Sequence, residues 1–119
     1  MSLITQQNPL GGKVITDTST DATAAANVTG AASNLTYIEV DNTANSAASY
    51  FKVYNHASPT VGTTAPDIVV RAAASSKEYF ICPQGVTLGT GLSYACTTAG
   101  GTAGTGFPSS AVIVRMIAS

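Results

Sequence analysis

The residues that could carry out chemistry are few, because the 119-residue chain holds one histidine, two cysteines and six acidic residues. A Ser/His/Asp triad or a histidine metal site would have to use His56. No flanking motif marks a nucleophile or a second ligand, and Ser58 and Pro59 follow it in a predicted turn. We therefore expect His56 to be an ordinary surface residue.

Cys82 and Cys96 flank a hairpin-like stretch, so two interpretations of the pair are open. Paired strands could bring their Cα atoms within disulfide distance. Alternatively, both are small buried hydrophobic residues in a reducing cytoplasm, which is the outcome we expect. Two cysteines without further ligands do not form a zinc site.

Asp17, Ser19 and Asp21 have the spacing of the first three oxygen ligands in a calcium-binding loop, at positions 1, 3 and 5. Ala22 and Val28 occupy the positions where that loop requires glycine and glutamate. A plain solvated loop is therefore expected, and the six acids include no obvious pair for glycoside hydrolysis. We expect no catalytic residue, no metal ligand and no cofactor site, so the chain is predicted not to be an enzyme.

The composition favours an assembled protein over a nucleic-acid or membrane protein. Charged residues make up 9% of the chain, against about 25% in an ordinary domain. A surface of Thr, Ser, Asn and Ala gives little repulsion between copies. The net charge of −1 and the dispersed basic residues argue against nucleic acid, and no apolar run is long enough to span a membrane. The first residues lack the features of a signal peptide, so synthesis in a cytoplasm is expected.

The pattern along the chain predicts seven or eight short strands at roughly ten-residue spacing and no substantial helix. This predicts an all-β fold, an antiparallel two-sheet β-sandwich of jelly-roll or Ig-like type. Residues 27–119 form the expected sandwich domain, and residues 1–26 an N-terminal arm and loop. The expected strands cover residues 13–16, 35–42, 49–55, 67–71, 77–82, 92–97 and 111–117.

Residues 37–54 contain two alternating runs around a small polar insert, a pattern typical of an antiparallel strand pair with one dry face. One face of this predicted pair should fill the core with Ile38, Val40, Phe51 and Val53. The other face gathers large side chains in a chain otherwise surfaced with small ones. We take it as the candidate interface: Tyr37, Glu39, Tyr50, Lys52 and Tyr54.

Four sequence blocks carry a resemblance: EVDNTAN at 39–45, YFKVY at 50–54, VGTTAPD at 61–67 and LGTGLSYA at 88–95. Taken in order, they resemble small β-sandwich virion structural proteins of tailed bacteriophages, in particular capsid cement or decoration proteins. The resemblance covers roughly residues 27–119.

The resemblance implies a non-enzymatic protein that is made in the host cytoplasm and sits on the capsid surface of the virion. There it would clamp neighbouring subunits of the major capsid protein and act as a homo-oligomer, most often a trimer. Related modules occur in tails and fibres, which leaves an alternative: a tail or fibre module that binds a host glycan or another virion protein. Strand tyrosines would then supply stacking platforms for sugars.

Overall fold

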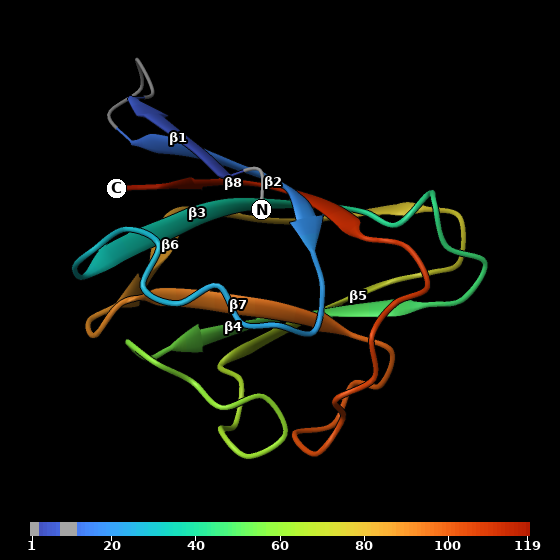
Figure 1. Cartoon of the computed structure of the whole chain (residues 1–119). Helices are drawn as coiled ribbons and strands as arrows, with labels where there is room; N and C mark the ends of the chain where they lie inside the picture. Colours follow the sequence, from blue (N-terminus) through green and yellow to red (C-terminus); the bar gives the residue numbers. More distant parts are fainter. Residues whose placement is uncertain (1–2, 8–11) are drawn as a thin grey trace.

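The computed structural model describes residues 3–7 and 12–119, and this part of the chain forms eight strands and no helix. Two antiparallel sheets face each other (Figure 1), which confirms the predicted β-sandwich. Nothing in the described part is a helix that could cross a bilayer. The larger sheet has the order β1 (Leu3–Gln7), β2 (Lys13–Thr20), β8 (Val112–Ala118), β3 (Ser33–Asp41) and β6 (Lys77–Leu88). The smaller sheet has the order β5 (Ile68–Ala72), β4 (Ser49–Asn55) and β7 (Leu92–Thr97).

The segment after β2 crosses to the smaller sheet and determines the topology. Ala25 exchanges two backbone hydrogen bonds with Tyr94 of β7, of 2.9 and 3.0 Å. Val28 adds a third, from its N–H to the carbonyl of Leu92 at 2.8 Å. If strands are counted from β2 and this segment is the second, the sheets have the orders 1-8-3-6 and 2-7-4-5. That is the order of a jelly roll, so the Ig-like alternative does not apply.

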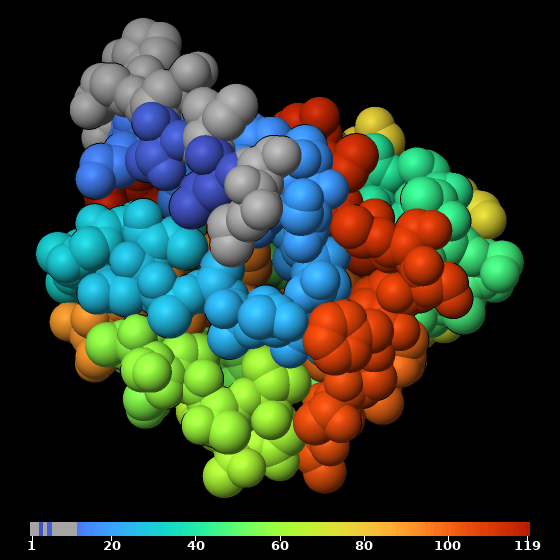
Figure 2. Space-filling view, in the orientation of Figure 1, coloured from blue at the N-terminus to red at the C-terminus, as the bar shows by residue number. Residues whose placement is uncertain are grey.

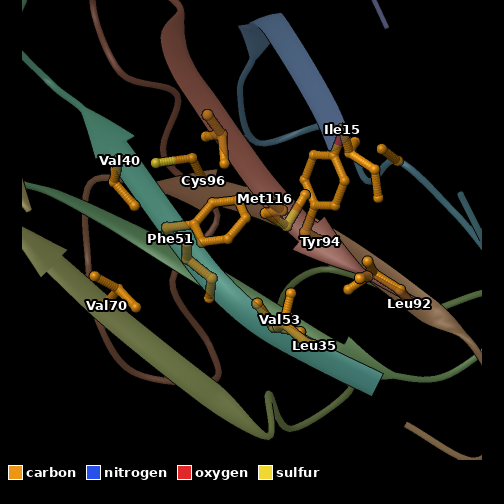
Figure 3. Close-up of a cluster of buried hydrophobic side chains, with 14 of the residues drawn as sticks. Ile15, Leu35, Val40, Phe51, Val53, Val70, Leu92, Tyr94, Cys96 and Met116 are labelled. Carbon is orange, nitrogen blue, oxygen red and sulfur yellow. The ribbon is translucent and has the colours of Figure 1, made fainter. Parts of the chain in front are cut away.

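The core lies between the two sheets and is built by alternation along the strands. Ile38, Val40, Phe51 and Val53 are all 0% exposed, as the sequence predicted. Figure 3 shows Val40, Phe51 and Val53 among the inward side chains that converge from both sheets. The ring centroids of Phe51 and Tyr94 are 5.4 Å apart.

The expected boundary at residue 26 is wrong for residues 13–20. These residues form β2, which pairs with β8 inside the five-stranded sheet, and Ile15 is fully buried opposite Met116. The signal was obscured because the second half of the strand consists only of Asp, Thr and Ser. Leu3–Gln7 also pairs, as β1, along the outer side of β2. Residues 1–2 and 8–11 of the expected arm lie outside the described residues.

The expected strand pair at residues 37–54 is also wrong, because β3 and β4 belong to different sheets. β3 pairs with β6 and β8, whereas β4 pairs with β5 and β7. The connection between them, residues 42–48, is a corner that carries the chain from one sheet to the other. Alternation correctly identified Ile38, Val40, Phe51 and Val53 as buried, but it carries no information on which strands pair.

Asn42, which begins this corner, is completely buried and is the hub of a hydrogen-bond network. Its amide nitrogen donates to three backbone carbonyls, and its amide oxygen accepts two side-chain hydrogen bonds. The acceptors are Ala47 at 3.0 Å, Ala72 at 3.3 Å and Ala73 at 3.0 Å, and the donors are Asn45 Nδ2 at 2.9 Å and Ser49 Oγ at 2.8 Å. One side chain therefore ties the β3–β4 corner to the connection between β5 and β6.

Candidate functional site

Within residues 3–7 and 12–119, no three His, Cys, Asp or Glu side chains gather in a way that could hold a metal ion. His56 lies exposed in a turn after β4, and its Nδ1 accepts a hydrogen bond of 2.9 Å from the backbone N–H of Ser58. The imidazole is thus engaged by its own turn. This placement agrees with the surface role expected from the sequence.

The two cysteines are both free and lie in different sheets, Cys82 on β6 and Cys96 on β7. Cys96 is 0% exposed, and burial raises the pKa of its thiol to about 12. A thiol reacts as the thiolate, so Cys96 is inert near neutral pH. The position of Cys96 in the core fits a packing residue.

The raised pKa of Cys96 makes stability depend on alkaline pH. The unfolded thiol releases its proton near pH 9.0, while the folded thiol keeps it until about 12. Within this window the folded state binds more protons, so the free energy of unfolding falls as pH rises, by up to about 1.4 kcal/mol per unit. Below the window, the contribution is fully present.

Urea unfolding of wild type and Cys96→Ala, both under reducing conditions, measures this effect. From about pH 8 to about pH 10.5 the variant should lose about 2 kcal/mol less than wild type. The cavity left by the substitution lowers the free energy of unfolding equally at every pH, so it does not change the slope of that free energy against pH. Other alkaline groups, such as Tyr94, are present in both proteins and cancel in the difference. Parallel pH curves for the two proteins would show that the thiol titrates alike when folded and unfolded.

The five residues predicted as one interface do not share a face. Tyr37 and Glu39 lie on the outer side of the five-stranded sheet, whereas Tyr50, Lys52 and Tyr54 belong to β4 of the other sheet. The prediction of a single surface is therefore wrong, for the same reason as the predicted strand pair. Lys52 and Tyr54 are moreover 0% and 1% exposed.

Lys52 is buried because a glycine-rich loop folds over it. The loops after β4 and β7 lie beyond the smaller sheet, away from the larger one (Figure 1). The ammonium nitrogen of Lys52 donates to the carbonyl of Gly101 at 2.7 Å and to that of Gly104 at 3.2 Å. Burial lowers the pKa of this ammonium. Lys52 therefore anchors the loop from inside.

The glycine-rich loop, residues 98–108, fits closely against its neighbours. A Cβ added at Gly100 would lie 2.9 Å from the Tyr50 ring, and one at Gly62 would lie 2.6 Å from the methyl of Thr105. Gly62 also has a φ of 96°, where other residues are strained. Figure 2 shows this loop (orange-red), the loop after β4 (yellow-green) and the segment after β2 (blue) meeting on one side of the molecule.

The outer face of the five-stranded sheet carries a band of apolar side chains, of which Ile81 and Tyr79 are exposed and the others half-buried. Registers align four of them across neighbouring strands: Val14 opposite Ile117, Ile117 opposite Tyr37, and Tyr37 opposite Ile81. We call these four residues the apolar row. Ile81 is 67% exposed, and beside it Tyr79 is 48% exposed, with its ring centroid 6.4 Å from that of Tyr37. The adjacent residues in register, Ile15, Met116 and Ile38, point to the other side of the sheet and are fully buried in the core.

The charges on this outer face neutralise one another. Arg115 Nη1 lies 2.8 Å from Glu39 Oε2, and Lys77 Nζ lies 3.8 Å from Asp41 Oδ2. The pKa of Asp41 is lowered, first by its hydrogen bond from Thr43 and further by Lys77. Exposed pairs of this kind add little stability. Their consequence is a face with balanced charge and an apolar centre.

A polar cavity of about 260 Å³ opens where the chain leaves β2 and crosses to the smaller sheet. Its inner wall is formed by Asp17, 1% exposed, whose Oδ2 accepts a 2.8 Å hydrogen bond from the hydroxyl of Tyr94. Burial, and then this carboxylate, raise the pKa of Tyr94. The sequence pattern singled out Asp17, Ser19 and Asp21. It gave no sign that Tyr94 joins them, because Tyr94 is 77 residues away from Asp17. The lining residues are Asp17, Ser19, Thr20, Asp21, Thr23, Ala24 and Tyr94.

The strand order and the core define the class of the protein as a small jelly-roll β-sandwich. Comparison with family models, with curated proteins and with solved structures finds no match to this chain. The fold assignment therefore depends on its own strand pairing, and the function must be argued from its surfaces.

Proposed function

We propose that this protein is a non-enzymatic structural protein of a phage virion, of the capsid cement or decoration type. It would bind major capsid protein subunits on the capsid surface and act as a homotrimer. The resemblance of the four sequence blocks to such proteins supports the virion assignment. The small, charge-poor jelly roll suits a component that is covered on several sides.

The observation that carries the proposal is the outer face of the five-stranded sheet. An exposed isoleucine and an exposed tyrosine stand there beside paired charges. Interface cores are depleted in charged residues and enriched in aromatic residues, and their buried apolar area drives association, while the rim stays polar. A free monomer would leave this band in water. The surface therefore favours an assembly component over a catalyst.

Electron microscopy of the source virion tests the proposed location. We expect density of the size of this jelly roll on the outside of the shell, at contacts between capsid subunits. Purified protein added to shells stripped of it should restore that density and raise the temperature at which the shells rupture. Density at the tail, or no density on the particle, would overturn the capsid assignment.

The polar cavity favours a second candidate function, a tail or fibre module that binds a host glycan. Its carboxylates and hydroxyls are groups that bind sugar hydroxyl groups. A glycan array probed with wild type and Thr23→Val distinguishes this candidate from the first. A glycan that binds wild type but not the variant would support a glycan module. An array without hits would show that none of the displayed glycans is a ligand.

A further inference from the structure

The five-stranded sheet has two edges, β1 and β6, and the β6 edge is blocked against pairing with another strand. β6 is the last strand of the sheet, and a register shift beside Pro83 interrupts its ladder with β3. Glu78 lies opposite the buried Val40, so an acidic residue occupies the core-side register at this edge. Its carboxylate also accepts a 3.0 Å hydrogen bond from the N–H of Tyr79. Prolines, bulges and inward-register charges are devices that prevent edge-to-edge pairing.

We propose that the outer face of this sheet, centred on the apolar row, is the self-association surface, covered by a second copy of this chain. Because the β6 edge is blocked, a partner that binds at this end of the sheet packs on its face. The face has balanced charge through its own ion pairs, so a highly charged partner such as nucleic acid would gain little there. A second copy matches it, since this chain is charge-poor, with 9% charged residues and a net charge of −1.

The size of the face approaches that of a specific interface. The apolar row crosses four strands spaced about 4.8 Å apart, and the strands extend about 3.3 Å per residue. With its side chains the face measures roughly 20 by 23 Å, or about 460 Å² in projection. A standard interface buries about 800 Å² of accessible surface on each partner. The relief of the side chains and the flanking rows bring the face close to that area.

This inference rests on the proposed homo-oligomer and names the surface that forms it. Light scattering and sedimentation equilibrium of purified wild type over micromolar concentrations should show an oligomer. In Ile81→Asp, a carboxylate would be buried against the surface of the second copy, so we expect a dissociation constant at least about tenfold larger. Ile81 is 67% exposed in the single chain, so the variant should keep the wild-type urea midpoint at monomeric concentrations.

Val69→Asp is the matched control, because Val69 is 43% exposed and belongs to the smaller sheet, opposite Lys52. It should leave the oligomer intact. Equal weakening by both variants, or a wild type that is monomeric throughout, would overturn the self-association surface. A monomeric wild type whose binding to purified shells is abolished by Ile81→Asp alone would assign the face to the capsid protein instead. If Ile81→Asp loses the oligomer but still binds shells, both the self-association surface and the capsid binding are supported. The two functions then use different surfaces.

Discussion

Asn42→Asp is expected to lower the free energy of unfolding by about 3–5 kcal/mol, one of the two largest losses we predict. The substitution keeps the shape of the side chain but replaces the amide nitrogen by a carboxylate oxygen. That oxygen would face the carbonyls of Ala47, Ala72 and Ala73, which now receive hydrogen bonds. A buried carboxylate without a cation among acceptors carries the full desolvation cost. Urea unfolding at neutral pH measures the loss.

Asn55→Asp provides the control for a change of amide to carboxylate. The side-chain oxygen of Asn55 accepts a hydrogen bond from the N–H of Thr90 at 2.9 Å in an exposed position, and aspartate retains that acceptor. We expect a change within about 0.5 kcal/mol. The deficit of Asn42→Asp relative to wild type should shrink as pH falls, because the buried carboxyl then takes up a proton. Equal stability of the two variants would show that the Asn42 network contributes no net stability.

Phe51→Ala is the second large effect, with an expected loss of about 3–5 kcal/mol. Phe51 is 0% exposed at the centre of the smaller sheet, and its ring packs 5.4 Å from that of Tyr94 between centroids. In a small jelly roll with a thin core, neighbouring side chains cannot fill the space left by a phenyl ring. The urea midpoint should fall while the m-value stays close to that of wild type.

Phe107→Ala removes the same atoms from an exposed position, since Phe107 is 60% exposed in the glycine-rich loop. Its expected effect on the free energy of unfolding is within about 0.5 kcal/mol. If the two phenylalanine variants were equally stable, the ring of Phe51 would not lie in a closed core. If Phe107→Ala alone reduced shell binding, the glycine-rich loop would be a second contact with the capsid.

The Asn42 network gives a structural reason for one of the four sequence blocks. Residues 39–45 span the end of β3 and the corner that follows it. Asn45 continues the network, because its Nδ2 donates to the carbonyl of Ser110 and its Oδ1 accepts from the N–H of Ser110, at 2.9 and 2.7 Å. The block thus fastens three connections at one end of the sandwich. Asn42 and Asn45 are needed by the fold itself.

The candidate surface could be predicted only in part. The sequence pointed to Tyr37 and Glu39 as outward residues of a strand, and both lie on the outer face of the five-stranded sheet. It missed Ile81, Ile117 and Val14, which complete the apolar row. These residues come from strands up to about a hundred positions apart, so only the registers between strands align them. No local pattern marks such a row.

The amino-acid sequence by itself determined the fold class and part of the core. Alternation with a period of two is a local property of each strand, so it identified Ile38, Val40, Phe51 and Val53 as buried without knowledge of their neighbours. Only the tertiary structure decided which strands pair and which outward faces stay in water. Lys52 shows the difference: its position predicted an outward side chain, and a loop about fifty residues further along the chain buries it. Long-range hydrogen bonds and corners such as that of Asn42 set these relations, and their partners are too distant in sequence to leave a local signal.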